Sequence, residues 1–225
     1  MKHYKVIAIG GMISVGKSVL VEELSSVPNS EIVYEIEKND SLTHLFLDWH
    51  QGSKSPIAST MFQVYFLTRC YLNHRNALFR VNPNTKWVFL DRTILEHIMF
   101  TKHYKSIDID VYHKMWKPAW VNYIKKLHEY DHCPDLYILL EGDVSTLFHR
   151  LVLRNRKEEM HNYQQLISSF VRTTKLYIEK MKKVLDEEGI PYHVINTNDL
   201  SKKEVLHETL KILGINKTSL LKQKE

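Results

Sequence analysis

Eight consecutive residues near the start of the chain have the spacing of a loop that binds phosphate groups. The segment Gly11-Met12-Ile13-Ser14-Val15-Gly16-Lys17-Ser18 fits the pattern G-x-x-x-x-G-K-[ST]. In this pattern backbone N–H groups face the phosphates, the lysine reaches the β- and γ-phosphates, and the serine hydroxyl ligates Mg²⁺. An apolar run precedes the loop and a helical pattern follows it, which is the context that the motif requires. The segment therefore predicts a nucleoside triphosphate site.

Two acidic residues follow apolar segments that read as strands, at the sheet edge where ligands of such folds lie. Glu35 ends the segment EIVYE, and Asp91 ends KWVFLD with Arg92 directly after it. A carboxylate beside the phosphate loop can hold Mg²⁺, and a neighbouring arginine can stabilise charge on a transferring phosphoryl group. Glu35 is a candidate to accept the proton of an attacking hydroxyl. The alternatives are a solvated strand end for Glu35 and a structural ion pair for Asp91 and Arg92.

A segment rich in arginine follows the fourth apolar segment. Arg150 and Arg154 lie four residues apart, which places them on one face of a helix, and Arg156 falls at the frayed end. Several arginines at such a junction are typical of a lid that closes over ATP. The alternative is a solvated helix end whose arginines pair with glutamates.

Five short apolar segments predict the strands that position these residues, and longer amphipathic segments predict helices between them. Because the strand segments are apolar throughout, we expect both faces of the sheet to be buried, as in a parallel sheet. The alternation predicts an α/β fold with a five-stranded parallel sheet sandwiched by helices. The strands are expected at 5–10, 31–35, 86–91, 135–142 and 191–196, and the helices at 17–26, 40–50, 57–80, 93–104, 110–130, 144–186 with a break near 155–160, and 201–213.

Composition restricts the class of protein. The formal net charge is +5, the hydrophobic fraction is 44%, and the basic residues are interleaved with acidic ones, which argues against a nucleic-acid partner. Two cysteines cannot form a disulfide framework, and no apolar run reaches the ~20 residues of a membrane helix. Because the first strand segment begins so early, no leader peptide is expected. We expect a cytoplasmic protein without a membrane partner, with one domain over 1–214 and a basic, solvated tail over 215–225.

Taken in order along the chain, these motifs resemble the deoxynucleoside kinases, the family of deoxyadenosine, deoxyguanosine and deoxycytidine kinases. The phosphate loop is followed by Glu35, by the segment FQVYFLT over 62–68, by DRT over 91–93, and by R-x-x-x-R-x-R-x-E-E over 150–159. The resemblance extends over residues 4–213. It implies a P-loop kinase fold, a homodimer, and transfer of phosphate from ATP and Mg²⁺ to the 5′-hydroxyl of a deoxyribonucleoside.

The resemblance also implies roles by position. Glu35 would be the general base, Arg92 would contact the 5′ oxygen and the phosphate, and Asp91 would take the metal-associated place. Gln63 would hydrogen-bond the edge of the base, for which an amide offers both a donor and an acceptor. Tyr65 is a candidate for stacking or for core packing. The lid over about 150–160 would contain Arg150, Arg154 and Arg156, with Glu159 as a candidate for the sugar 3′-hydroxyl.

Four positions depart from the family pattern. Ser14 stands where the loop commonly has glycine, and Ile36 stands where proline usually follows the acid, so Glu37 is a second candidate base. Cys70 and His97 occupy the places of an arginine and an aspartate that often pair at the base. Base preference therefore does not carry over from the family.

Two other functions remain open on the sequence. The departures at Cys70 and His97 would fit an enzyme with a different acceptor, namely a nucleoside monophosphate kinase that acts on dTMP or a modified dNMP. A P-loop protein that binds nucleotide or nucleic acid without transferring phosphate is the alternative from a different class.

Overall fold

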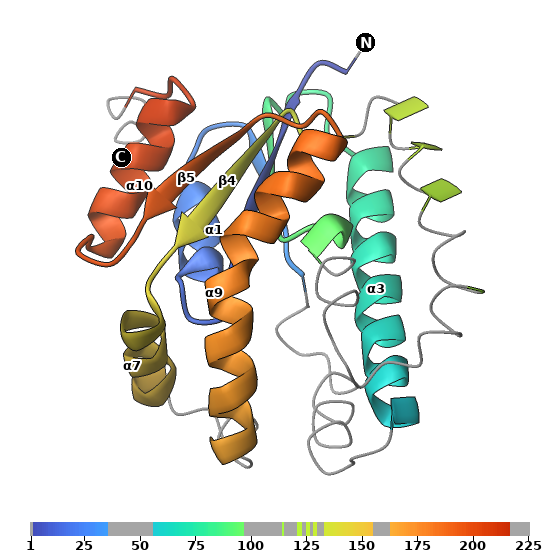
Figure 1. Cartoon of the computed structure of the whole chain (residues 1–225). Coiled ribbons are helices and arrows are strands. Elements are labelled where there is room, and N and C mark those ends of the chain that lie inside the picture. The colour runs from blue at the N-terminus through green and yellow to red at the C-terminus, as the bar shows by residue number, and fades with distance from the viewer. Residues whose placement is uncertain are drawn as a thin grey trace.

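Five parallel strands form one sheet in the centre of the molecule, as the sequence predicts (Figure 1). The strands are β1 (Lys5–Gly11), β2 (Ser30–Val33), β3 (Trp87–Asp91), β4 (Leu136–Glu141) and β5 (Tyr192–Asn196). Their order across the sheet is β2-β3-β1-β4-β5. The structure, a computed structural model, describes residues 2–35, 56–96, 114, 121–122, 125–126, 128–129, 133–154 and 163–216, with the backbone alone at 56–63, 66 and 163–169.

Helices cover both faces of this sheet. The helices are α1 (Lys17–Leu24), α3 (Pro56–Phe79), α7 (Val144–Arg154), α9 (Tyr163–Glu187) and α10 (Lys202–Ile212). Helices α1 and α10 pack together on one face, whereas α9 crosses the opposite face and α3 stands beside β2 (Figure 1). The described part of the chain has a helix ending at Arg154 and another beginning at Tyr163, which fits the expected break. The helices expected at 40–50 and 110–130 fall wholly or largely outside the described residues, as does most of 93–104.

The central strands are buried throughout because helices lie on both of their faces. Every residue of β1 after Lys5 is buried, and so are the last four residues of β3. The register pairs Ile9 of β1 with Asp91 of β3. Since both strands run in the same direction, the loop after β1 and the residues after β3 emerge side by side. This juxtaposition positions the candidate site.

One expected strand is shorter than the sequence pattern predicts. The segment 31–35 was expected to be extended to its end, but β2 ends at Val33, where its pairing with Leu90 of β3 ends. The next two backbone carbonyls, of Tyr34 and Glu35, accept hydrogen bonds from the Asn73 side chain of α3 at 3.2 and 3.3 Å. A side chain of α3 therefore replaces the strand partner at this point.

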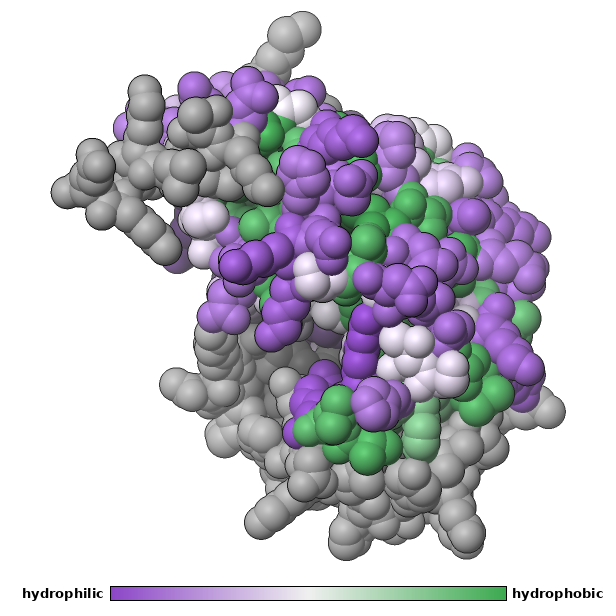
Figure 2. Space-filling model, turned by 90° about the vertical axis from the view of Figure 1, so that its left-hand side faces the viewer, coloured by the Kyte–Doolittle hydropathy of each residue, from purple (hydrophilic) through white to green (hydrophobic). Residues whose placement is uncertain are grey.

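The face of the molecule that carries α7 and α10 is mainly hydrophilic among the described residues (Figure 2). Along α10, Lys202, Lys203 and Glu204 are exposed in succession, and Lys211 lies 3.9 Å from Glu208. Basic and acidic side chains are therefore interleaved on this helix. In the part of the chain that the structure describes, no helix is long and apolar enough to cross a membrane.

Candidate active site

The loop between β1 and α1 has the backbone shape that a phosphate-binding loop needs. Gly16 has a φ of 108°, and Ser14 has a φ of 66°, in the left-handed region that favours glycine. This conformation explains why glycine is common at the position of Ser14 in the family pattern. Helix α1 begins at Lys17, directly after Gly16, so the N–H groups of its first turn face outward from the sheet edge.

Lys17 is buried inside this loop. Its Nζ donates a hydrogen bond to the backbone carbonyl of Met12 at 3.0 Å. Burial, together with the nearby charge of Arg92, lowers the pKa of Lys17 from 10.5 to about 8. A lysine held in this way has a strong preference for an anionic partner, which phosphate oxygens would supply.

Ser18 and Asp91 meet at the edge of the sheet. The Ser18 hydroxyl donates a hydrogen bond to Asp91 Oδ2 at 2.9 Å. The other oxygen, Oδ1, is buried, and none of the described residues donates a hydrogen bond to it. Burial raises the pKa of Asp91, and the charge of Lys17 partly opposes this shift. A hydroxyl beside a carboxylate with a spare oxygen is a donor set that suits Mg²⁺, so these two residues fit the metal that the sequence predicts.

Arg92 connects the end of β3 to two carboxylates. Its N–H donates to the Ile9 carbonyl at 3.0 Å, and its φ of 67° turns the chain sharply after Asp91. The guanidinium Nε lies 3.1 Å from Glu35 Oε2, and Nη1 lies 2.9 Å from Glu96 Oε2. Although burial alone would lower the pKa of Arg92, these two carboxylates raise it above its usual value. Arg92 is thus a permanent cation beside the phosphate loop.

Glu35 lies at the open side of this pair. Its side chain is 21% exposed, whereas that of Glu96 is completely buried. The Asn73 amide donates to the backbone carbonyls on both sides of the Glu35 Cα atom, so α3 positions the Glu35 carboxylate opposite Arg92. Glu35 is therefore the carboxylate of the two that an entering molecule could reach. Sequence reasoning missed Asn73, for which no local pattern gives a signal.

Glu96 is a second residue that sequence reasoning missed. It accepts hydrogen bonds from Tyr137 at 2.9 Å, from Tyr177 at 2.6 Å and from the Gly11 N–H at 3.4 Å, besides its contact with Arg92. The signal that could have found it is its position four residues after Arg92, in a segment expected to be helical.

Two residues of α3 support the turn at Arg92. His74 Nε2 donates a hydrogen bond to the Arg92 carbonyl at 3.1 Å, and Cys70 Sγ lies 3.8 Å from the same nitrogen. Burial raises the pKa of Cys70 well above its usual value, with a further contribution from the charge of Glu35. The cysteine that replaces the family's arginine is therefore a neutral thiol packed behind the site.

The arginines of α7 have different surroundings. Arg150 donates from Nη1 to Thr197 Oγ1 at 3.0 Å and from Nη2 to the Thr197 carbonyl at 2.6 Å, so it ties α7 to the end of β5. Arg154 is exposed in the last turn of the helix. Thr197 was also missed by sequence reasoning. The role of both arginines in a lid stays a prediction.

Two predicted site residues, Gln63 and Tyr65, lie on α3. Tyr65 is half-buried on α3, and of Gln63 only the helical backbone is described. The positions of Ile36, Glu37, His97, Arg156 and Glu159 lie outside the described residues. Their expected roles at the base, the sugar and the lid remain predictions.

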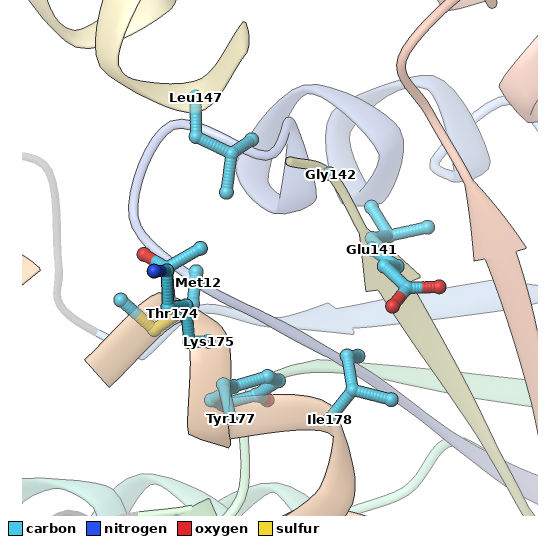
Figure 3. Close-up of a pocket in the computed structure, with 9 residues that line it drawn as sticks. Met12, Glu141, Gly142, Leu147, Thr174, Lys175, Tyr177 and Ile178 are labelled. Atoms are coloured by element: carbon cyan, nitrogen blue, oxygen red, sulfur yellow. The ribbon is translucent and has the colours of Figure 1, made fainter. Parts of the chain in front are cut away.

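A small pocket opens on the α9 side of the loop (Figure 3). Met12 of the loop, Glu141 and Gly142 after β4, and Thr174 and Tyr177 of α9 line it. The Thr174 hydroxyl is buried and makes no hydrogen bond with the described residues. The pocket shows that α9 approaches the phosphate loop directly.

Comparison with known proteins identifies the family. The family model described as deoxynucleoside kinase matches residues 7–212. The uncharacterized protein MG268 homolog of Mycoplasma pneumoniae is 31% identical over 209 residues, which cover 92% of this chain and 88% of that protein. The uncharacterized protein MG268 of Mycoplasma genitalium is 31% identical over 192 residues, or 84% of this chain and 82% of that protein.

Solved structures of the same fold agree with this match. A deoxyadenosine kinase from M. mycoides with bound dATP superposes with a TM-score of 0.62 at 20% identity, over 94% of this chain and 100% of that chain. A thymidylate kinase from Candida albicans superposes with a TM-score of 0.58 at 18% identity, over 96% and 94%. These likenesses show a P-loop kinase fold, and the family match covers nearly the whole of it. The chain belongs to the deoxynucleoside kinase family.

Proposed function

We propose that this protein transfers the γ-phosphoryl group of ATP to the 5′-hydroxyl of a deoxyribonucleoside, with Mg²⁺ as cofactor. The observation that carries the proposal is the contact between Arg92 Nε and Glu35 Oε2, 3.1 Å apart. It places a partly exposed carboxylate and a permanent cation together beside the phosphate loop. Transfer to a hydroxyl needs both groups, a proton acceptor and a charge that faces the phosphoryl group.

In the proposed reaction, the phosphate loop binds the phosphoryl donor, ATP. Its N–H groups and Lys17 would bind the β- and γ-phosphates, and the buried ammonium would stabilise charge that develops on them. Ser18 and Asp91 would hold Mg²⁺, which, when bound, neutralises charge on the phosphates. The spare oxygen of Asp91 supports this assignment.

The acceptor side rests on Glu35 and Arg92. Glu35 would accept the proton of the 5′-hydroxyl, while Arg92 would hold the same oxygen and the transferring phosphoryl group in line. A monophosphate acceptor has an oxygen that is already ionised near neutral pH, since the second pKa of a phosphate monoester is about 6. A carboxylate at the acceptor position is therefore useful for a hydroxyl and of little use for a monophosphate.

The remaining roles follow from the family resemblance. Gln63 would hydrogen-bond the base, Tyr65 would stack or pack beside it, and Glu159 would bind the sugar 3′-hydroxyl. Because Cys70 and His97 stand where the family often has a charged pair at the base, the base preference does not carry over from the family. Arg150, Arg154 and Arg156 would belong to a lid that closes over the phosphates. A homodimer is the assembly that the resemblance supports, and light scattering of the purified protein tests it.

The test is a screen of acceptors by ATP-coupled release of ADP. The four deoxynucleosides, their ribose counterparts and their monophosphates are compared at equal concentrations. We expect the highest kcat/KM with a deoxynucleoside. Turnover of monophosphates alone would identify a monophosphate kinase. Binding of ATP without phosphorylation of any acceptor would identify a non-catalytic nucleotide-binding protein.

A further inference from the structure

A carboxylate that the proposed reaction does not use is buried directly behind Arg92. Glu96 has no exposed side-chain surface, yet its oxygens lie within hydrogen-bonding distance of groups from four different segments. Oε2 accepts hydrogen bonds from Arg92 Nη1 at 2.9 Å, from Tyr177 Oη at 2.6 Å and from the Gly11 N–H at 3.4 Å. Oε1 accepts a hydrogen bond from Tyr137 Oη at 2.9 Å. A fully buried acid is kept in a protein only where such partners compensate for its lost hydration.

Every one of these partners is a hydrogen-bond donor. Burial, followed by the charge of Glu96, raises the pKa of Tyr137 and of Tyr177 well above the usual value, so both phenols keep their protons. Oε2 accepts from the Arg92 guanidinium and the Gly11 N–H, which can only donate, and from Tyr177, so this oxygen acts as an acceptor only beside a permanent cation, as a carboxylate oxygen does. Arg92 thus lies between two carboxylates, one buried and one partly exposed.

Gly10 leaves room for the Glu96 carboxylate because glycine has no Cβ atom. A Cβ atom added to Gly10 would lie 2.9 Å from Glu96 Oε1 and 2.5 Å from a ring carbon of Tyr137. Glu96 therefore packs against the backbone of β1 just before the phosphate loop. Through its four contacts it links this loop, the turn after β3, strand β4 and helix α9.

We propose that Glu96 is the positioning residue of the site: its fixed negative charge holds the Arg92 guanidinium in place for phosphoryl transfer and keeps Arg92 from pairing fully with Glu35. The contacts at 2.9 Å to Glu96 and 3.1 Å to Glu35 leave the guanidinium shared between the two acids. Without the charge of Glu96, the balance of attraction on Arg92 would shift toward Glu35, which the guanidinium already contacts. Glu35 would then be a weaker proton acceptor, and Arg92 would be drawn toward it. This inference rests on the proposed function.

The variant Glu96→Gln isolates the charge of this side chain. Its amide nitrogen can take the place of Oε1, because Tyr137 can then accept from it and donate to Thr93 Oγ1, which lies 2.9 Å from the phenol. The remaining oxygen keeps the positions of Arg92 and Tyr177. The side chain thus keeps its shape and its hydrogen bonds and loses only its charge.

The matched control is Tyr137→Phe. It removes the hydrogen bonds of the phenol to Glu96 Oε1 and to Thr93 Oγ1, and it leaves the charge of Glu96 and its contact with Arg92 in place. With the best nucleoside, we expect Glu96→Gln to lower kcat about tenfold or more, since small misplacements of a catalytic group are costly. The KM values for ATP and for the nucleoside should change less than about threefold, because a loss confined to the transition state appears in kcat. Tyr137→Phe should keep kcat within about twofold of the wild type, even though this variant too loses buried hydrogen bonding.

A second measurement tests the charge pair without reference to activity. Arg92→Met leaves Glu96 buried without its cation, whereas Arg92→Met combined with Glu96→Gln removes both charges. Since an unpaired buried charge is strongly destabilising, we expect the double variant to melt roughly 5–10 °C above Arg92→Met. A double variant that melts at or below the single one would contradict the charge pairing.

The outcomes separate this inference from the proposed function. If the wild type phosphorylates a nucleoside and Glu96→Gln keeps its kcat, or loses kcat no more than Tyr137→Phe does, the positioning role is wrong and the proposed function stands. If the wild type phosphorylates no nucleoside, the proposed function is wrong, and the melting temperatures still decide whether Glu96 holds Arg92.

Discussion

Lys17 and Arg92 are both buried cations, but their surroundings act on them in opposite ways. Lys17 Nζ donates a hydrogen bond to a neutral carbonyl, and burial together with the charge of Arg92 lowers its pKa to about 8. Arg92 faces two carboxylates, which raise its pKa although burial opposes them. The charge of Lys17 therefore depends on pH and on a bound ligand, whereas the charge of Arg92 is permanent.

ATP binding should take up protons above pH 8. The phosphates favour the protonated form of Lys17, whereas the free loop with its pKa of about 8 is partly neutral at pH 8.5. As pH rises through this range, the Kd for ATP should increase toward a limit of about tenfold per pH unit. Calorimetry at pH 8.5 in two buffers with different ionisation enthalpies measures the protons taken up. The control Lys17→Arg should bind without proton uptake, and an unchanged Kd with no uptake in the wild type would contradict the role of Lys17.

Glu35→Gln should remove the proton acceptor and leave the donor site intact. We expect kcat with a nucleoside to fall by about 10²- to 10⁴-fold, the usual contribution of a general base. The Kd for ATP should stay within about twofold, because only interactions with the acceptor are changed. Glu23→Gln, on the exposed side of α1, is the matched control and should behave as the wild type. A Glu35→Gln enzyme with undiminished kcat would exclude Glu35 as the base.

Asp91→Asn should weaken the metal site specifically. The substitution keeps a hydrogen-bonding partner for Ser18 and removes the negative charge at the buried oxygens. We expect the Mg²⁺ concentration for half-maximal activity to rise about tenfold or more, since carboxylate charge dominates the binding of this cation. A titration of activity with Mg²⁺ at saturating ATP measures the change. An unchanged Mg²⁺ requirement would contradict a metal-associated role for Asp91.

At the scale of secondary-structure elements, helices hold the ends of strands in place. Helix α3 holds the residues after β2 through Asn73 and the turn after β3 through His74. Helix α7 holds the end of β5 through Arg150, and α9 reaches Glu96 through Tyr177. The strand ends form the site, and each of these three helices contributes at least one polar side chain that holds them or their neighbours in position.

The two arginines of α7 should separate into a structural and a functional residue. Arg150→Ala removes two hydrogen bonds to Thr197 and should lower the melting temperature by about 3–8 °C, because charged hydrogen bonds are worth more than neutral ones. Arg154→Ala, one helical turn later and exposed, should leave the melting temperature within about 1 °C, as surface substitutions usually do. It should raise the KM for ATP if the lid prediction holds. Thermal melts and initial rates of the two variants give both quantities, and equal melting losses would contradict the division.

At the scale of the whole molecule, the sequence was sufficient to predict the five-stranded parallel sheet and to bring Ser18, Asp91 and Arg92 to one edge of it. Continuous apolar segments such as β1 and β3 predict buried parallel strands, and parallel strands bring their carboxyl ends to one edge. The neighbourhood of Ser18, Asp91 and Arg92 follows from this geometry. The expected strand end at Glu35 was two residues too long, because Asn73 captures the chain there.

The rest of the site depends on contacts between distant positions that no local pattern reports. Tyr177 reaches Glu96 across 81 residues, and Thr197 reaches Arg150 across 47. Each pair requires that α9 or β5 be packed against the sheet before the contact exists. A buried acid such as Glu96 also looks like a surface residue in the sequence, since the partners that compensate for its burial are dispersed.

The most direct test of the central claim is the ³¹P NMR spectrum of the product formed from ATP and the best deoxynucleoside. We expect, besides ADP, one phosphomonoester resonance that the two protons on C5′ split into a triplet. This pattern identifies a 5′-monophosphate, the product of transfer to the hydroxyl opposite Glu35 and Arg92. A phosphomonoester doublet would place the phosphate on the 3′-hydroxyl, and the absence of a phosphomonoester would mean that no nucleoside hydroxyl is phosphorylated. Either result would contradict the proposed reaction.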